Sequence, residues 1–429
     1  MAFVQALLAD PSIPIKDRQD ALHRVFADPG IPGPLRESTS SFWFKDPHPQ
    51  LANMQSPELP QEADVVIIGS GITGASIART LLESSDQLGH IGKKTPAVVM
   101  LEARDTCTGA TGRNGGHILE TVEEFADWEA LYGLEAAKAL MRFRLAHLAE
   151  ILKVADQYGL KKETQARKTN TPVTQVSTDD TSSLRYAVQT PRGILRARHV
   201  IHCTNAHVGH LVPELRGHVY PVRGQMSAQN PGSKFICQAT EHSWLFNYER
   251  GFDYLTQLPP AGESSGKMML GGGFAQGRNN GLADLGIPTD SELSLSCDIH
   301  LSGALSAVFG RENWGHVAGP SVEQMWTGNM GFSSDGLPWV GQLPSSVSYA
   351  AGTTEQDGAQ WVCCGFSGEG MVQAWLSGTA VAKMLLSSDR KHHLRPDYLS
   401  WFPEQMLLTE ERLEKAGLTR VVSDRASNL

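Results

Sequence analysis

Long hydrophobic runs, clustered cysteines and basic stretches are all scarce in this chain of 429 residues. No stretch reaches the roughly 20 apolar residues that cross a bilayer, so a membrane span is not expected. The six cysteines are scattered apart from the adjacent Cys363 and Cys364, which indicates neither a zinc site nor a disulfide framework. The formal net charge is -9 and basic residues form no long run, so nucleic acid and anionic membranes are not expected as partners. Small molecules are expected instead.

The N-terminal sequence MAFVQALLADPSIP has no basic segment and too short an apolar core for a secretory signal, which predicts a cytoplasmic protein. The final Ser427-Asn428-Leu429 resembles the peroxisomal address Ser-Lys-Leu, so a peroxisomal location is the alternative. With 41% hydrophobic residues, the chain can build the cores of about two or three domains. The oligomeric state is not predicted.

The stretch 63–82, ADVVIIGSGITGASIARTLL, predicts a strand, a tight turn and a helix. Gly69, Gly71 and Gly74 have GxGxxG spacing: the first permits the turn, the second allows close approach of a pyrophosphate, and the third allows the helix to pack on the strand. The free N–H groups at the helix start would then meet negative charge. The pattern indicates a dinucleotide site. An ordinary strand–turn–helix is the alternative, because a lone GxGxxG is weak evidence in a chain with 42 glycines.

A second apolar strand, 97–101, ends in Glu102, whose carboxylate can accept both ribose hydroxyls of an adenosine. The distance from Gly74 exceeds the usual spacing of roughly 20 residues. We attribute the excess to a polar surface loop over 84–96. The following segment, 103–117, is rich in glycine and small hydroxyl residues and contains Arg104 and Arg113. It is expected to lie flat against a planar ligand while one guanidinium pairs with phosphate, or else to be a long flexible loop.

Residues 1–60 are expected to form an extension with one helix near 16–26. Phe42, Trp43 and Phe44 of this extension are expected to dock against the folded body, because their exposure to water would be unfavourable. A long helical region over 119–158 is expected to break near Gly133. The apolar face predicted to be buried in its second half consists of Leu134, Ala137, Met141, Leu145, Leu148, Leu152 and Ala155.

Short extended segments over 171–202 predict a small antiparallel meander that leads into a buried strand at 200–203. Further strands around 220–228, 252–258 and 267–272 predict a second, mainly antiparallel sheet, and a weaker helix is expected at 291–309. Near the C-terminus a strand at 361–364 enters a glycine turn and a helix, so a second helix start can meet an anion there. A short surface helix is expected at 409–416.

Three segments together resemble the flavoprotein family of D-amino-acid oxidase and sarcosine oxidase, which also contains glycine oxidase and gamma-glutamylputrescine oxidase. They are IIGSGITGASIA with Glu102, GATGRNGGH at 109–117 and GFSGEGM at 365–371, supported by PVRGQM at 221–226 and HVIHCTNAH at 199–207. The resemblance implies FAD and a combined α/β and α+β fold, in which a glutathione-reductase-like Rossmann domain is joined to a shortened, mainly antiparallel substrate domain. The implied division is an N-terminal extension (1–60), the first part of the FAD domain (61–160), a meander and return strand (171–210), a substrate domain (215–325), the C-terminal part of the FAD domain (326–390) and a tail (391–429).

The resemblance also implies roles for individual residues. The first glycine turn would hold the pyrophosphate, Glu102 the adenosine ribose and the backbone of Val173 the adenine, while Gly368 to Met371 would lie at the pyrimidine edge of the flavin. The full set expected to bind FAD is Gly69, Gly71, Ile72, Thr73, Gly74, Glu102, Ala103, Arg104, Gly109, Ala110, Thr111, Arg113, Asn114, Gly115, Gly116, His117, Val173, Thr204, Asn205, Gly368, Glu369, Gly370 and Met371.

The reaction that the resemblance implies is hydride removal from a carbon bearing an amine, giving an imine, with dioxygen reduced to hydrogen peroxide. Tyr254 and Trp326 are the residues expected to line the substrate pocket, or else to be core aromatics. Two other functions stay open. One is a flavin-binding protein without turnover, and the other is a nicotinamide-dependent flavin monooxygenase using GGGF at 271–274 as a second nucleotide site.

The sequence departs from the family in three places. Sarcosine oxidases attach flavin through a cysteine just upstream of the position of Trp326, but the sequence here is EQMWTG, which leaves His117 as the nearest candidate for a covalent link. Val372 stands where those enzymes place a lysine for the substrate carboxylate, so an amine without a carboxylate, or a larger metabolite, fits better. Only residues 160–170 separate the long helix from the strand at Thr171, where relatives carry a long part of the substrate domain. This short link would fit a compact variant, an open pocket for a bulky substrate, or a truncated gene model.

Overall fold

The structure is a computed structural model. It describes residues 2–47, 52, 54–89, 96–118, 123–157, 171–178, 182, 184–238, 242–260, 266–347, 358–388 and 399–418. The predicted link at 160–170 lies outside these residues, as do residues 391–398 and 419–429 of the predicted tail.

The larger sheet has seven described strands, with a parallel centre. Its main order is β11 (Trp339–Gln342), β12 (Gln360–Cys364), β5 (Gly193–His202), β1 (Glu62–Ile68) and β2 (Val98–Leu101). Neighbours from β12 to β2 run parallel, while β11 pairs antiparallel with β12. The predicted meander is present as β3 (Gln175–Thr178) and β4 (Tyr186–Thr190), which continue antiparallel from β5.

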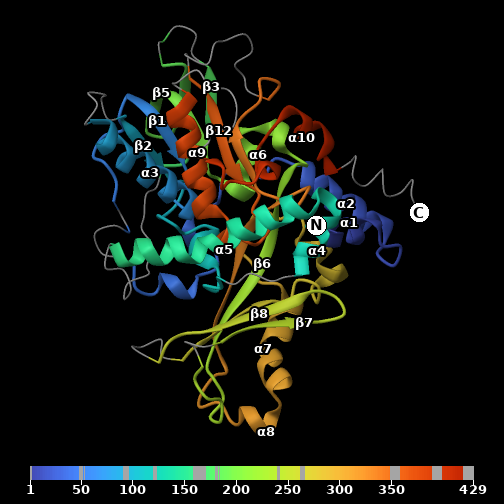
Figure 1. The fold of residues 1–429 in the computed structure, drawn as a ribbon. Helices are drawn as coiled ribbons and strands as arrows, with labels where there is room; N and C mark the ends of the chain where they lie inside the picture. Colours follow the sequence, from blue (N-terminus) through green and yellow to red (C-terminus); the bar gives the residue numbers. More distant parts are fainter. Residues whose placement is uncertain are drawn as a thin grey trace.

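Alternation along β1 sends side chains into two separate cores. Val65 and Ile67 pack in a core with α3 (Ile72–Gly89), α5 (Leu134–Gln157) and α9 (Ala374–Ser388), whereas Val66 and Ile68 pack with the meander. Figure 1 shows these helices crossing one side of the sheet, with α5 lying across the level at which the upper and lower parts of the molecule meet. The β1 strand is thus buried on both faces, as the unbroken apolar run predicts.

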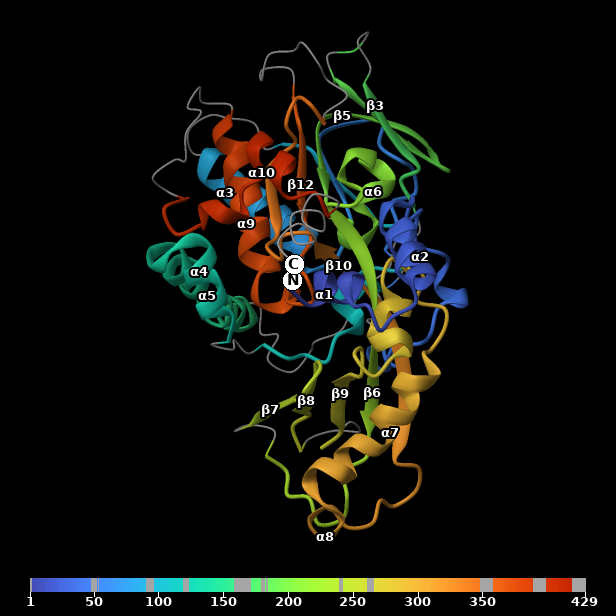
Figure 2. The ribbon, with the colours of Figure 1, turned by 90° about the vertical axis from the view of Figure 1, so that its right-hand side faces the viewer.

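The second sheet is antiparallel throughout. Its order is β10 (Val322–Ser333), β6 (Val219–Gln229), β9 (Met268–Gly272), β8 (Phe252–Gln257) and β7 (Ser243–Asn247). One face of this sheet is covered by α7 (Leu295–Phe309) and α8 (Arg311–Trp314), whose Leu301 and Trp314 pack on Leu255 and Leu270. Figure 2 shows this sheet below the larger one, with α7 beside it. The predicted fold class is therefore confirmed.

The N-terminal extension packs beside the junction of the two sheets (Figures 1 and 2). The expected helix is α2 (Ile15–Phe26), and α1 (Ala2–Ala9), which was not predicted, packs in the same core with Tyr220 and Val222 of β6. The aromatic group docks as expected, because Phe42 is buried beside Met226 and Trp326. Short helices α6 (Val208–Leu211) and α10 (Glu410–Lys415) complete the described helices, together with α4 (Glu123–Tyr132).

Two predictions about helices were wrong. The loop expected over 84–96 is helical as far as Gly89, where α3 ends. The break at Gly133 is confirmed, with φ +86° between α4 and α5, but the buried face of α5 is not the predicted leucine face. Leu145, Leu148 and Leu152 are 60%, 44% and 51% exposed. The residues of α5 that are buried are Ala137, Leu140, Phe143, Arg144 and His147.

This departure from the predicted face has a physical reason, because the two polar residues on the buried face have partners from distant segments. Arg144 pairs with Glu124 and Glu369 and lies 4.6 Å from the ring centre of Trp128, while His147 Nε2 accepts a hydrogen bond from the Leu376 N–H at 3.1 Å. Burial of a polar group is inexpensive when it is paired in this way.

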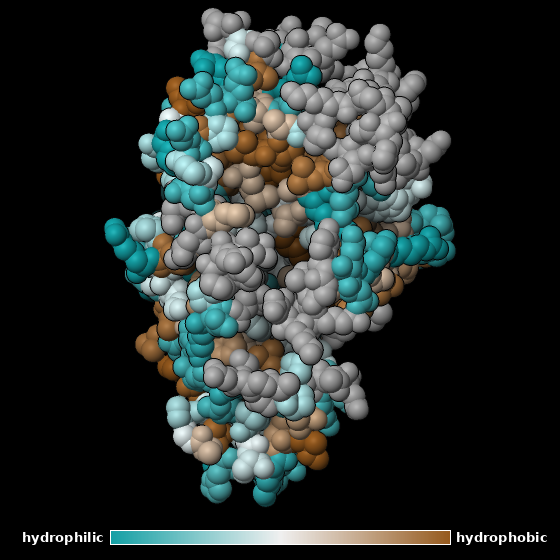
Figure 3. Space-filling view, turned by 90° about the vertical axis from the view of Figure 1, so that its left-hand side faces the viewer, coloured by the Kyte–Doolittle hydropathy of each residue, from teal (hydrophilic) through white to brown (hydrophobic). Residues whose placement is uncertain are grey.

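No helix in the described part of the chain is long and apolar enough to cross a membrane. Apolar surface on the face drawn in Figure 3 occurs in patches among hydrophilic side chains.

Candidate functional site

The first glycine turn has the geometry that its spacing predicts. Gly69 has φ +111°, and a Cβ added there would lie 2.7 Å from the carbonyl oxygen of Cys203 on the neighbouring strand end. A Cβ on Gly74 would lie 2.1 Å from the carbonyl oxygen of Gly69, so α3 packs on the turn at a distance that only glycine permits. The start of α3 is therefore fixed at the end of β1.

Glu102 and the second motif lie beside this turn. The Glu102 carboxylate accepts hydrogen bonds from the Ser70 N–H at 2.9 Å and the Ser70 hydroxyl at 2.6 Å. Thr111, in the short 3-10 helix Ala110–Arg113, accepts from the Ile72 N–H at 3.1 Å through its hydroxyl. The segment expected to lie by the pyrophosphate is thus ordered against the helix start rather than flexible.

The C-terminal glycine turn reaches the same place. Asn205, in the left-handed region at φ +44°, follows the end of β5, and its Oδ1 accepts from the Gly365 N–H at 2.9 Å. The Ser367 N–H donates to the carbonyl of Gly331 on β10 at 2.8 Å. These contacts hold the turn that precedes α9 between the two sheets.

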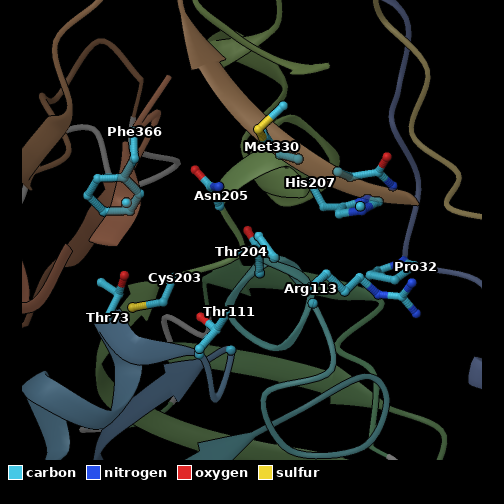
Figure 4. A pocket seen from close by; sticks show the side chains of 18 of the residues that line it. Pro32, Thr73, Thr111, Arg113, Cys203, Thr204, Asn205, His207, Met330 and Phe366 are labelled. Carbon is cyan, nitrogen blue, oxygen red and sulfur yellow. The ribbon is translucent and has the colours of Figure 1, made fainter. Parts of the chain in front are cut away.

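Residues from all these segments line one large cavity (Figure 4). Most predicted cofactor residues line it: Gly69, Gly71, Ile72, Thr73, Glu102, Ala103, Arg104, Gly109, Ala110, Thr111, Arg113, Asn114, Val173, Thr204, Asn205, Gly368, Gly370 and Met371. Tyr254, predicted for the substrate pocket, also lines it. The glycine turns near the two ends of the chain therefore converge on a single cavity.

Several predicted residues do not line this cavity. Trp326 is fully buried in the core around Phe42, and its Nε1–H donates to the Arg113 carbonyl at 2.7 Å, so it is a core aromatic. His117 does not line the cavity; its Nδ1 lies 3.0 Å from the Ser243 hydroxyl, and its ring contacts the Tyr254 ring. Gly74, Gly115, Gly116 and Glu369 are also outside the cavity wall, Gly74 because its role is in packing and Glu369 because it pairs with Arg144.

Arg104 and Arg113, one of which was expected to pair with phosphate, both lie beside the carboxylate of Asp290. Asp290 accepts from Arg104 Nη1 and Nη2 at 2.7 and 2.9 Å, and Arg113 Nε lies 3.2 Å from the same carboxylate. Burial opposes ionisation of Asp290, but the two guanidiniums outweigh it and hold its pKa below the ordinary value. Burial also lowers the pKa of Arg113 to about 10, which leaves it charged at neutral pH. The counter-charge comes from a distant loop and could not be read from the local motif.

Other cavity residues were missed. Gly224, Gln225 and Met226 come from β6, within the PVRGQM segment, which could have signalled them. Gly328, Asn329 and Met330 come from the paired strand β10, and Gly30, Ile31 and Pro32 come from the N-terminal extension. The remaining residues that were not predicted are Ile68, Cys107, Cys203, Ala206, His207, His210, Leu211, Asp290, Phe366 and Ala374.

The cavity has the polar character that a nucleotide cofactor needs. Thr204 Oγ1 and Asn329 Oδ1 are buried, line the cavity and have no protein hydrogen-bond partner among the described residues. Buried polar atoms are rarely left unpaired, so these two fit contacts to a polar ligand. Together with the glycine turn and Glu102, they fit a dinucleotide.

Comparison with curated protein sequences gives no match. Three solved structures are similar in fold. L-amino acid deaminase from Proteus myxofaciens has 12% identity, covers 84% of this chain and 96% of its own, and has a TM-score of 0.49. L-proline dehydrogenase from P. horikoshii has 16% identity, 84% and 100% coverage and a TM-score of 0.46. Glycine oxidase from Geobacillus kaustophilus has 17% identity, 82% and 99% coverage and a TM-score of 0.42.

A sequence model of the family DAO, described as FAD dependent oxidoreductase, matches residues 64–168 and 160–384. These ranges contain both glycine turns, Glu102 and the whole second sheet. The N-terminal extension lies before them. The chain belongs to the DAO family of FAD-dependent oxidoreductases, and FAD is its cofactor.

Proposed function

We propose that this oxidoreductase converts an amine C–N bond to an imine, with dioxygen as the electron acceptor. When bound, FAD supplies the hydride acceptor at N5, and its reoxidation by dioxygen yields hydrogen peroxide. The observation that carries this proposal is the single cavity in which both glycine turns meet the face of the second sheet that bears Met226 and Tyr254.

The side chains around the cavity favour an apolar amine without a carboxylate. Met226, Tyr254 and Met330 are the large apolar and aromatic side chains of the cavity wall on the second sheet, beside Gly224, Gln225, Gly328 and Asn329. Carboxylate recognition usually requires an available cation, often a bidentate arginine. Arg104 and Arg113 are both engaged with Asp290, and Val372, at the position of the carboxylate-binding lysine in sarcosine oxidases, is buried in the core.

The two histidines on the cavity wall do not replace that cation. Burial lowers the pKa of His207 to about 4, so it is neutral near pH 7, and its Nδ1 lies 3.0 Å from the Gly30 carbonyl. His210 Nδ1 lies 3.0 Å from the Asp28 carboxylate. Neither histidine offers an uncompensated charge to a substrate carboxylate.

Tyr254 orients and encloses the substrate rather than accepting its proton. Burial, with a smaller contribution from Asp253, raises the pKa of Tyr254 to about 12, and its hydroxyl donates to Met226 Sδ at 3.1 Å. A phenol with this pKa stays protonated near neutrality. The reactive substrate is therefore the free amine, and the rate of reduction should rise with pH until the amine of the bound substrate is deprotonated.

The test is anaerobic mixing of the yellow holoprotein with pairs of compounds that share a side chain, one an amine and the other its α-carboxylate. Flavin absorbance should bleach with the amine and not with the amino acid, and readmission of air should produce hydrogen peroxide. Bleaching by the amino acid alone would overturn the substrate class. If dithionite reduces the flavin but no amine bleaches it, the chain is a flavin-binding protein without turnover.

A further inference from the structure

Residues 28–45, which we term the N-terminal strap, lie before the segment that the family model matches. The first part of the strap lies against the cofactor cavity. Gly30, Ile31 and Pro32 line the cavity directly. Pro32 is drawn in Figure 4 beside Arg113, on the side of the cavity where His207 also lies. The strap therefore forms part of the wall that encloses the ligand.

The start of the strap is anchored on the segment around α6. The Gly30 carbonyl lies 3.0 Å from His207 Nδ1, and the Asp28 carboxylate lies 2.9 Å from Arg216 Nη2. Further on, the Gly33 carbonyl accepts from Arg104 Nε at 2.6 Å. These bonds keep the backbone of residues 30–33 against the cavity.

The second half of the strap is hydrogen-bonded to the loop 110–114 of the second motif. Arg113 donates to the Thr39 carbonyl and to the Ser38 hydroxyl, each at 2.8 Å, and the Trp43 Nε1–H donates to the Asn114 carbonyl at 2.7 Å. Arg113 and Asn114 both line the cavity. Phe42 fixes this part of the strap by packing in the core with Met226 and Trp326.

The loop 110–114 also contacts the start of α3. Thr111 in this loop accepts from the Ile72 N–H, so a shift of residues 111–114 would disturb the first turn of α3 as well as the cavity wall. Arg113 is buried, and loss of its strap acceptors would leave guanidinium donors unpaired. Opening of the strap is therefore linked to opening of the loop.

We propose that the N-terminal strap is a clasp for FAD: Ser38 and Trp43 act as positioning residues that hold the loop 110–114 against the cofactor and slow its release. The inference rests on FAD as the cofactor and not on the proposed oxidation of amines. It assigns a binding role to a segment outside the region that the family model matches.

The test compares FAD release from wild type, Trp43→Phe and Ser38→Ala, measured from the rise of free flavin fluorescence after dilution, with the dissociation constant from titration of apoprotein. Each variant should release FAD about threefold to tenfold faster, the effect of losing one partly buried hydrogen bond. Ser38→Thr, which keeps the hydroxyl, should behave as wild type. Arg36→Ala is the matched control on the strap, because this side chain is 84% exposed.

Melting of the apoprotein and holoprotein separates a clasp from a purely structural segment. A clasp predicts a smaller stabilisation by added FAD in Trp43→Phe and Ser38→Ala than in wild type at the same FAD concentration. Unchanged FAD release and affinity in both variants, even with lower melting temperatures, would overturn the inference. Failure of every amine to bleach the flavin would reject the proposed reaction and leave this result unaffected.

Discussion

Asp290 pairs with two buried arginines, and its replacement by asparagine tests this arrangement. Arg104 and Asp290 side chains are each 5% exposed, and that of Arg113 is 1% exposed. Removing one partner from a buried ion pair typically costs about 3–5 kcal/mol, because a charge is left without compensation. Asparagine keeps one acceptor oxygen, so we expect a loss of about 3 kcal/mol for Asp290→Asn.

That loss should lower the midpoint of thermal unfolding by about 6–12 °C, at about 2–4 °C per kcal/mol for domains of ordinary size. The assay is circular dichroism of the apoprotein, with Glu37→Gln as control. Glu37 belongs to a surface ion pair whose side chains are 84% and 64% exposed, so its change should have little effect. An equal effect of both substitutions would refute the reasoning.

Wild type and Asp290→Asn should also differ in how their stability depends on pH. The folded-state pKa of Asp290 is lowered, so its stabilising contribution is present above the unfolded value of about 3.9 and is lost as the pH falls through the folded value. The stability difference between wild type and Asp290→Asn should be constant at neutral pH and shrink below about pH 4. A difference that persists in strong acid would contradict the role assigned to this carboxylate.

Three further predictions follow from local geometry. Gly74→Ala should prevent normal packing of α3, because the added Cβ would lie 2.1 Å from the Gly69 carbonyl oxygen. The matched change is Gly303→Ala in the exposed part of α7, where an added Cβ would have nothing within 4 Å. It should raise the free energy of unfolding in urea by about 0.5–1 kcal/mol. Leu140→Ala should lower the free energy of unfolding by about 2–5 kcal/mol, while Leu148→Gln should leave it nearly unchanged because Leu148 is 44% exposed; equal losses would restore the leucine face as the buried one. Acid precipitation should release all flavin into the supernatant, since His117 does not line the cavity, and a yellow pellet would show a covalent link.

The sequence predicted the local parts of the site well. Gly69, Gly71 and Glu102 could be recognised because strand, turn and helix are encoded within about 40 residues and their conformations depend on nearby residues. The second motif and the C-terminal turn were recognised through the family resemblance. Their convergence on one cavity follows from the parallel sheet, because β12, β5, β1 and β2 run parallel and their carboxyl ends meet at one edge.

Contacts between distant segments could not be predicted. One of Arg104 and Arg113 was expected to pair with phosphate because their segment follows the second strand beside the expected pyrophosphate, whereas their shared partner Asp290 is supplied from far along the chain. For Trp326 the substrate pocket and the core were both open, and the core could not be chosen from the sequence because its neighbours Phe42 and Met226 come from other elements. The leucine pattern of α5 gave the correct helix and the wrong face, since Arg144 is buried beside partners from distant segments, among them Glu124 and Glu369.

The central claim is that the two glycine turns near the ends of the chain hold one FAD between them. Titration of the apoprotein with FAD, followed by the absorbance of bound flavin, tests it most directly. We predict saturation at one FAD per chain. An apoprotein that stays colourless at saturating FAD would contradict the account.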